Sequence, residues 1–358
     1  MADTTSTASG GQQFNLLRVL GPVHVWALGV GIVLVGEFMG WNFSVGKGGA
    51  MGSLIACWVI GLLYTCVAMI DSEVTSTVAA AGGQYAQAKH IIGPLMAFNV
   101  GLYLVMAYTM LEAADALVVG DLLAVVAAEM GHEALDPKPF VVLTIAILAF
   151  LNYRGVFMTL TINFVITAAA FLSIIILFVG VQPWNPGAIL QHHDLLTDLP
   201  YGWIGVIAAF QFGIWYYLGI EGTCQAAEEV RSPARSLPLG TMSGIITLLI
   251  AASLTWYMAS GLLPWEYLGQ AAVPLYDTAR MTGSTLLQIF LFIGTTFAAI
   301  ASANGCIDAA RRAWFSMGRD RYLPSWFAAV HPRYHTPYRS IIFLIPIAVS
   351  FGFTGLLD

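Results

Sequence analysis

One long apolar segment near the start of the chain is interrupted by Gly36-Glu37-Phe38-Met39-Gly40-Trp41-Asn42-Phe43-Ser44. This stretch puts a carboxylate, an amide and two glycines where a helix that crosses a bilayer is usually most apolar. Its Gly-Trp-Asn run is also weak helix-forming material. Irregular backbone is tolerated at membrane depth only where it is buried in protein or lines a cavity. We therefore expect a broken helix here, and a transport site at the break.

The composition indicates that the solvent of this chain is lipid. Of its 358 residues, 58% are hydrophobic and 9% are charged, whereas soluble domains have about 25% charged residues. We predict an all-α polytopic membrane protein, with a cytoplasmic, disordered N-terminal segment at 1–23 and a transmembrane domain at 24–358. The cysteines lack metal-ligand or CxxC spacing, which indicates small packing residues: Cys57, Cys66, Cys224 and Cys306.

Nine stretches have about the 20 residues that a ~30 Å hydrocarbon core requires. They are 24–45, 50–71, 94–120, 139–154, 156–181, 202–227, 238–262, 284–308 and 340–357. If the N-terminus is cytoplasmic, 11 of the 14 lysines and arginines fall inside and three (Lys47, Lys138 and Arg280) fall outside. This distribution obeys the positive-inside rule and predicts a multi-pass protein of the plasma (inner) membrane.

The sixth span repeats the unusual composition of the first. Its sequence Trp215-Tyr216-Tyr217-Leu218-Gly219-Ile220-Glu221-Gly222-Thr223 places a second intramembrane acid between two glycines. The glycines could serve only close helix packing. However, broken helices at corresponding positions of two halves are typical of transporters built from inverted repeats, with a site near the membrane midplane.

Several motifs together resemble those of the amino acid–polyamine–organocation transporter superfamily. They occur in the order of the family, over nearly the whole chain: Ala81-Gly82-Gly83-Gln84-Tyr85, Asn152-Tyr153-Arg154-Gly155, Glu228-Glu229-Val230-Arg231-Ser232-Pro233 and Gly318-Arg319-Asp320-Arg321-Tyr322-Leu323-Pro324. The ethanolamine permease branch looks closest, because of the motif at 36–43.

This resemblance implies a LeuT-type inverted-repeat (5+5) fold with broken helices one and six. The first repeat would span 24–181, and the second, 202–358, would be incomplete. Relatives carry twelve spans, whereas this chain ends after span nine, so we expect it to be truncated after that helix. A truncated, non-transporting membrane protein is therefore one alternative function.

Four acids lie inside the predicted spans and away from the span ends: Glu37, Glu112, Asp115 and Glu221. No lysine or arginine lies in the hydrophobic centre of any span. Because unpaired ions at the midplane cost several kcal/mol, each acid must be protonated, hydrated, or paired with a cation that the protein does not supply. A protonated amine substrate or a transported proton meets this requirement.

The resemblance also implies a set of substrate-binding residues around the two breaks. Trp215 would be an aromatic gate, and Tyr108 and Glu112 share a helix face. As alternatives, Trp41 faces lipid, Glu112 and Asp115 lie in an outer vestibule, or Tyr108 only packs. The implied set is Glu37, Phe38, Gly40, Trp41, Asn42, Tyr108, Glu112, Trp215, Leu218, Gly219, Ile220, Glu221, Gly222, Ser302 and Cys306.

The substrate expected from these residues is a small amine without a carboxylate. In amino acid carriers of the superfamily, small residues at the first break let backbone N–H groups bind the substrate carboxylate. Here the break reads Gly40-Trp41-Asn42, and Glu37 and Glu112 add negative charge. We therefore expect a secondary transporter of ethanolamine, with an amino acid permease or antiporter as the alternative.

Energy coupling is expected to involve Glu221, because burial without a cationic partner disfavours the charged carboxylate. The fifth-helix lysine of some proton-coupled relatives is missing, since its position matches Ala169. Sodium bound by helix-one carbonyls and Ser302, or plain exchange, stay open as alternatives.

No enzyme, metal site, cofactor or nucleic-acid partner is expected, and the sequence indicates no oligomeric state. The motif His192-His193-Asp194 is read as a solvated loop. The cytoplasmic arginines are expected to pair with Glu228, Glu229 and Asp320, and to contact anionic lipid headgroups.

Overall fold

The structure is a computed structural model that describes residues 16–129, 136–184 and 199–354. The first 15 residues and the loop with His192-His193-Asp194 lie outside this part. Within it, the regular structure is helical apart from one parallel β-bridge, between Leu20 and Val230.

The first half of the chain contains α1 (Pro22–Val33), α2 (Val35–Phe38), α3 (Phe43–Thr77), α4 (Gln84–Ile91), α5 (Pro94–Glu129), α6 (Lys138–Arg154), α7 (Val156–Val181) and η1 (Gln182–Trp184). The second half contains α9 (Gly202–Gly213), η2 (Ile214–Tyr216), η3 (Ile220–Glu229), α10 (Pro233–Leu262), α11 (Trp265–Leu268), α12 (Pro274–Met281), α13 (Thr285–Arg319), η4 (Ser325–Ala328) and α14 (Tyr338–Phe353).

Among the described residues, six helical segments are long and apolar enough to cross a membrane, and α1 and α14 are shorter apolar helices. The six are Phe43–Thr77, Pro94–Ala124, Val156–Val181, Gly202–Glu229, Pro233–Leu262 and Thr285–Arg319. Large apolar side chains such as Leu62, Ile204 and Ile207 point outward and are 67%, 82% and 68% exposed. Such a surface suits contact with lipid tails, so this is a multi-pass membrane protein.

The first and second predicted spans are joined differently from the expectation. Residues 43–45, predicted to end the first span, form the start of α3, which kinks at Gly49 (φ 71°, ψ 179°) and continues to Thr77. The kink is possible because glycine tolerates a positive φ. The C-terminal end of the first predicted span and all of the second therefore form one bent helix.

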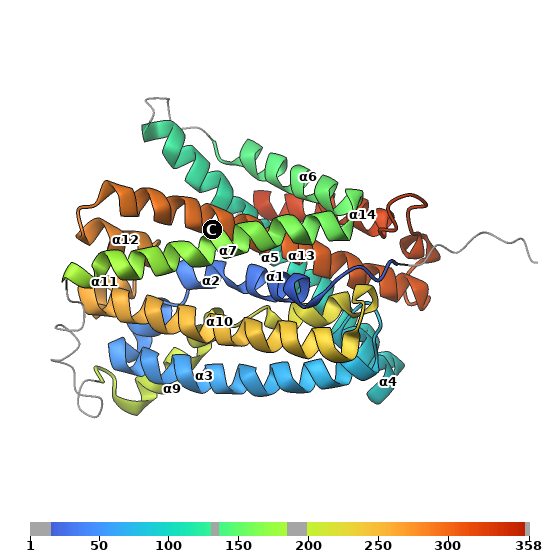
Figure 1. The fold of residues 1–358 in the computed structure, drawn as a ribbon, viewed down its shortest axis with the longest axis horizontal. Coiled ribbons are helices and arrows are strands. Elements are labelled where there is room, and N and C mark those ends of the chain that lie inside the picture. Colours follow the sequence, from blue (N-terminus) through green and yellow to red (C-terminus); the bar gives the residue numbers. More distant parts are fainter. Residues whose placement is uncertain (1–15, 130–135, 185–198, 355–358) are drawn as a thin grey trace, which may run out of the picture.

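The helices pack in reciprocal pairs. The second span (α3) packs along α9 of the sixth, and the seventh (α10) packs along α1 of the first. Likewise α5 packs on α13, and α6 on α14. Figure 1 shows α1 and α2 in the middle of the molecule, between α7 and α10. This symmetry between halves is expected of inverted repeats, and it buries the first broken helix at the centre.

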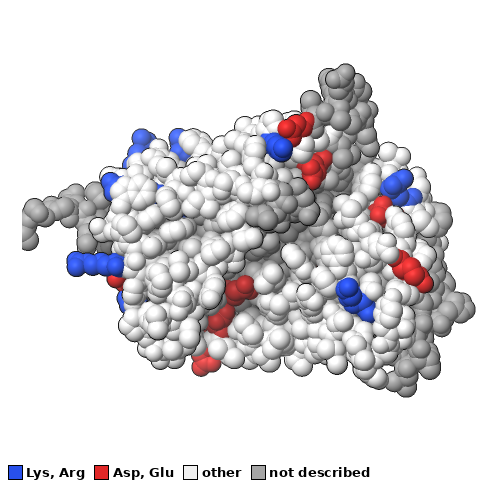
Figure 2. Space-filling view, turned by 180° about the vertical axis from the view of Figure 1, so that it is seen from behind, with Lys and Arg blue, Asp and Glu red and all other residues white. Residues whose placement is uncertain are grey.

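The positively charged residues gather toward the two ends of the molecule. Figure 2 shows lysine and arginine side chains toward the two ends of one face, while the middle is almost free of them. One end carries the segment before α1, which pairs with the end of η3 through Leu20 N–H to Glu229 O (3.0 Å) and Arg231 N–H to Leu20 O (2.9 Å). We call this the inner end.

Candidate functional site

The first membrane segment is interrupted twice. α1 ends at Val33, with Leu34 between it and α2. After α2, Met39 is extended (φ −155°, ψ 159°) and Gly40 takes a φ of 95°. The predicted break at 40–42 is thus confirmed, and the small interruption at Leu34 is additional.

The second predicted break, in span six, is also confirmed. η2 ends at Tyr216, Gly219 takes a φ of 112°, and η3 begins at Ile220. The Glu221 carboxylate turns back on the break, where its Oε2 accepts a hydrogen bond from the Gly219 N–H at 3.0 Å. An acid here satisfies a backbone donor that the break leaves free.

The two breaks touch each other. A Cβ at Gly36 would overlap the carbonyl oxygen of Trp215, and a Cβ at Gly40 would lie 3.5 Å from the Trp215 ring. On the other side, a Cβ at Gly219 would meet Ile32 at 2.5 Å. The close approach therefore requires glycine at Gly36, while Gly40 and Gly219 take positive φ values that favour glycine.

Glu37 lies at this contact and has no hydrogen-bond partner. Its side chain is fully buried, and within the described part of the chain neither carboxylate oxygen is bonded. It faces Cys57 of α3 and Tyr217. Trp41 is also fully buried, which excludes the lipid-facing alternative, and it stacks on Tyr216 with ring centroids 5.4 Å apart. The result is a buried acid beside an aromatic wall.

A second group of acids lies between α5 and α13. Glu112 and Asp115 are 0% and 3% exposed and interact electrostatically with each other and with Cys306. Ser302 lies against Asp115 and donates to the carbonyl of Ile32 at 2.7 Å, near the end of α1. Both oxygens of Glu112 lack a bonding partner in the part of the protein described.

A cavity of about 290 Å³ lies beside the second break, between it and α5. Tyr108 lines it from α5, and Trp215, Leu218, Gly219 and Glu221 line it from span six. The remaining lining residues are Leu104, Ala107, Met110, Leu111 and Ala114. Glu37 and Glu112 do not line this cavity, so the acids form separate groups rather than one ring.

Three other predicted site residues have packing contacts. Phe38 packs on α13, and Ile220 packs on α1 and α10. Gly222 brings η3 close to α5, since a Cβ there would lie 3.4 Å from the Tyr108 hydroxyl.

The Asn42 side chain holds the segment that joins α11 and α12. Its Nδ2 donates to the carbonyl of Leu268, the last residue of α11 (2.7 Å), and to that of Ala271, between α11 and α12 (2.8 Å). Its Oδ1 accepts from the Gly40 N–H at 3.2 Å. The amide therefore ties the first break to the loop between α11 and α12, with both of its N–H donors used.

Sequence reasoning missed one buried acid, Asp71, near the inner end of α3. It is 9% exposed, and its Oδ2 accepts a hydrogen bond from Gln84 Nε2 at 3.0 Å. The signal was present, since Asp71 is the last residue of the predicted span 50–71, but it was not counted among the acids inside the spans.

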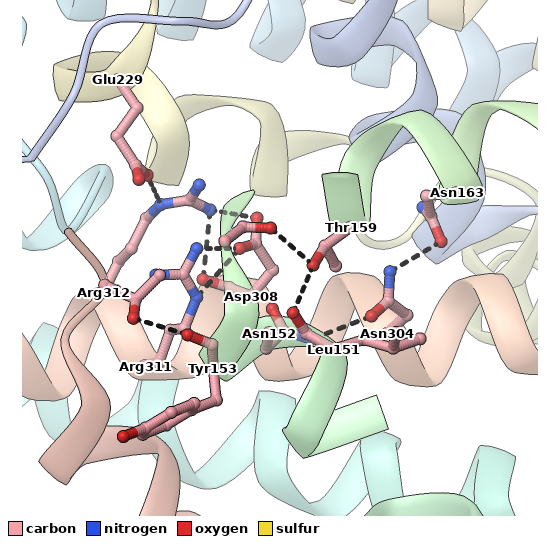
Figure 3. A network of polar contacts seen from close by, with 12 residues as sticks. Leu151, Asn152, Tyr153, Thr159, Asn163, Glu229, Asn304, Asp308, Arg311 and Arg312 are labelled. Carbon is pink, nitrogen blue, oxygen red and sulfur yellow. Dashed lines mark hydrogen bonds and ion pairs between the residues drawn. The ribbon is translucent and has the colours of Figure 1, made fainter. Parts of the chain in front are cut away.

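The inner end is closed by a buried ionic cluster, drawn in Figure 3. Arg312 of α13 pairs with Glu229 of η3 and with Asp308, and Asp308 also pairs with Arg311. All four side chains are buried. The expected pairing of Arg312 with Glu229 is confirmed, but Arg311 and Arg312 are not the surface residues that the positive-inside count implied.

An amide chain adjoins this cluster in Figure 3. Asn152 donates to Asn304 (2.9 Å), Asn304 donates to Asn163 (3.0 Å), and Asn163 donates to the Ala27 carbonyl of α1 (3.0 Å). The chain fixes α1 to α6, α7 and α13 without using charge.

Surface contacts complete the inner closure. Glu228 pairs with Arg319 and Asp320 pairs with Lys89. Tyr85 of α4 donates to Asp320 at 2.7 Å. Burial, followed by this carboxylate, raises the pKa of Tyr85, so its hydroxyl keeps the proton that it donates.

Comparisons with known proteins agree with this architecture. A family model described as "Amino acid permease" matches residues 18–357. An uncharacterized transporter of Rhizobium meliloti (strain 1021) is 70% identical over 359 residues, covering 100% of this chain and 77% of that protein. A methylthioribose transporter of Bacillus subtilis (strain 168) is 28% identical over 350 residues, covering 91% and 72%.

Among solved structures, MhsT in complex with L-phenylalanine matches with a TM-score of 0.67 and 15% identity, over 94% of this chain and 79% of that one. At this identity the match concerns the fold alone. It confirms the predicted LeuT-type architecture with its broken helices.

Proposed function

Since the chain belongs to the amino acid permease family, we propose that this secondary transporter imports or exchanges a small amine, with ethanolamine as the expected substrate. The observation that carries this proposal is Glu37, whose buried carboxylate has no hydrogen-bond partner among the described residues. Burying an unpaired charge is costly. A protonated amine beside Glu37 would remove that cost.

The aromatic wall beside Glu37 supports a cation. The rings of Trp41 and Tyr216 stack on each other, and Tyr216 interacts electrostatically with Glu37. A cation over such a ring gains ~0.5–2 kcal/mol, more when the site is desolvated.

The first break offers little to a substrate carboxylate. Carboxylates bind at helix ends through free backbone N–H groups, but Asn42 Oδ1 already accepts the Gly40 N–H. An amino acid stays the second candidate, favoured by the family match over residues 18–357.

The other site residues are assigned by position. Trp215, 37% exposed and lining the cavity, is proposed as the gate between that cavity and Gly40. Tyr108, Leu218 and Gly219 would shape the cavity wall. Glu112 on α5 and Ser302 and Cys306 on α13 would form a second polar binding site.

Glu221 is proposed as the proton-linked acid. It lies at the second break and lines the cavity, and none of the ion pairs in the described part involves it. Coupling to sodium through Ser302 and α1 carbonyls is the alternative, and exchange without an ion is another.

Uptake of labelled ethanolamine into proteoliposomes tests the substrate. We expect unlabelled ethanolamine to compete, and alanine, arginine and putrescine to compete weakly. Strong competition by alanine without competition by ethanolamine would show that the substrate is a zwitterionic amino acid.

The variant Glu37→Gln tests the ammonium site. Because it removes the charge and keeps the shape, uptake of a cationic amine should fall by about tenfold or more, the effect of ~1.4 kcal/mol. Uptake of a zwitterion should fall less. Glu266→Gln, at an exposed acid near α11, is the matched control and should leave uptake unchanged. An equal loss for both substrates would reduce Glu37 to a structural role.

A further inference from the structure

Asp71 of α3, which the site proposed above does not use, shares a hydrogen-bond network with Glu221. The side-chain amide of Gln84, at the start of α4, joins the two residues. Its Nε2 donates to Asp71 Oδ2 at 3.0 Å and to the main-chain carbonyl of Glu221 at 3.2 Å. Three elements (α3, α4 and η3) therefore meet at one amide group.

This network has more hydrogen-bond acceptors than donors. Gln225 Nε2 donates to Gln84 Oε1 at 3.1 Å, but the buried Gln225 Oε1 has no partner in the described part. The Tyr108 hydroxyl, 4% exposed, is likewise without a partner and interacts electrostatically with both Glu221 and Asp71. Buried polar atoms are normally bonded, so Gln225 Oε1 marks a place where a hydrogen is needed, whereas the Tyr108 hydroxyl has its own hydrogen and lacks an acceptor.

No positive charge compensates the two acids. They lie close enough to interact electrostatically with each other, and neither takes part in the ion pairs of the described residues. The other titratable groups that face them are neutral hydroxyls and thiols: Tyr64 of α3, Tyr108 of α5, Cys224 of η3 and Cys306 of α13.

We propose that Asp71 and Glu221 form a carboxyl pair that binds one exchangeable proton, which deepens the proposed transport function and rests on it. Two carboxylates in one site resist carrying two charges. They therefore titrate as a pair rather than separately. The proton binds between acids of α3 and η3, so its arrival and departure change the charge where α3, α4 and η3 meet.

Proton-driven uptake in proteoliposomes with an inward pH gradient tests the pair. The variants are Asp71→Asn, Glu221→Gln and the double variant. Asn at position 71 keeps an acceptor for Gln84, so the local bonds survive. We expect each single variant to lose about tenfold or more of the gradient-driven accumulation, corresponding to ~1.4 kcal/mol. The double variant should be no worse than either single one, because both remove the same proton.

Glu73→Gln is the matched control, since Glu73 is an exposed acid on the same helix, and it should keep the wild-type pH dependence. Substrate exchange without a gradient should persist in Asp71→Asn and in Glu73→Gln, since neither residue lines the cavity. If Asp71→Asn keeps full gradient-driven uptake while Glu221→Gln loses it, Glu221 acts alone and the pair is wrong. Losses that multiply in the double variant would show two independent protons.

A second readout does not need the substrate. In an infrared pH titration of the purified protein, one protonated-carboxyl band should disappear in Asp71→Asn and in Glu221→Gln alike. If wild type shows this band but transports no amine, the proposed substrate is wrong and the pair stands. If each variant removes a different band, the pair is refuted. Loss of uptake when choline replaces sodium would instead identify a sodium site.

Discussion

Asn42 is the residue through which the first break reaches the outer end of the protein. The variant Asn42→Ala removes two donors to the Leu268 and Ala271 carbonyls. Each such bond contributes ~0.5–1.5 kcal/mol, and unsatisfied buried carbonyls add to the loss. We expect a lower midpoint of thermal unfolding and greater proteolysis between α11 and α12.

The control for this variant is Asn99→Ala. Asn99 is half-buried, and its side chain donates to the Leu95 carbonyl of its own helix in a solvent-exposed hydrogen bond, so its removal should change neither measurement. If Asn42→Ala behaves like the control, the outer loop is held by other contacts. The freed Gly40 N–H should also let Asn42→Ala accept a zwitterion better than wild type does.

At the scale of single residues, the sequence indicated four of the buried acids but not how these acids group in space. Glu37, Glu112, Asp115 and Glu221 were expected inside apolar spans, and all four lie in buried surroundings. Their separation into groups depends on which face of each helix turns inward, which spacing alone does not determine. Asp71 was missed because it stands at the very end of the predicted span 50–71, whereas α3 continues to Thr77 and encloses it.

The ionic cluster on α13 and η3 belongs to the scale of elements. Glu229→Gln removes one carboxylate but leaves Arg312 paired with Asp308. Asp308→Asn removes the carboxylate that both arginines share. Breaking a buried ion pair leaves an uncompensated charge and destabilises the fold by ~3–5 kcal/mol. We therefore expect Asp308→Asn to lower the thermal midpoint more than Glu229→Gln does.

The exposed ion pair between Asp277 and Arg280 provides the matched control for the buried cluster. Asp277 and Arg280 are 3.9 Å apart, and Arg280 is 66% exposed. Exposed pairs contribute only ~0–1 kcal/mol, so Asp277→Asn should hardly change the midpoint. Equal effects of Asp277→Asn and Asp308→Asn would mean that water reaches the inner cluster.

Both helix breaks could be predicted because glycines and acids inside an apolar segment conflict with a continuous helix. The joining of spans one and two could not, because the bend depends on a single positive φ at Gly49. The sequence also did not indicate that Arg311 and Arg312 are buried. Charge near a predicted helix end suggests an aqueous loop, yet α13 continues to Arg319 and its last turns are enclosed by η3, η4 and α14.

At the scale of the whole molecule, the closed inner end and the reciprocal packing of the two halves describe one conformation of a transporter. The segment before α1, the end of η3 and α13 converge there. Opening this end requires the Leu20–Val230 bridge and the ionic cluster to separate together. In hydrogen exchange, the Val19, Leu20 and Arg231 amides should therefore lose protection as a unit when the inner end opens.

The orientation in the membrane gives the last prediction. Positive-inside counting places the inner end in the cytoplasm. Lys47, at the start of α3, and Arg333, between η4 and α14, are both exposed. In intact cells, a maleimide that cannot cross membranes should label Lys47→Cys, and should label Arg333→Cys only after permeabilisation. Wild type is the control, since three of its cysteines are buried and Cys66 lies within an apolar helix. The reverse labelling pattern would invert the orientation, and the proton site at Asp71 and Glu221 would then face the outside.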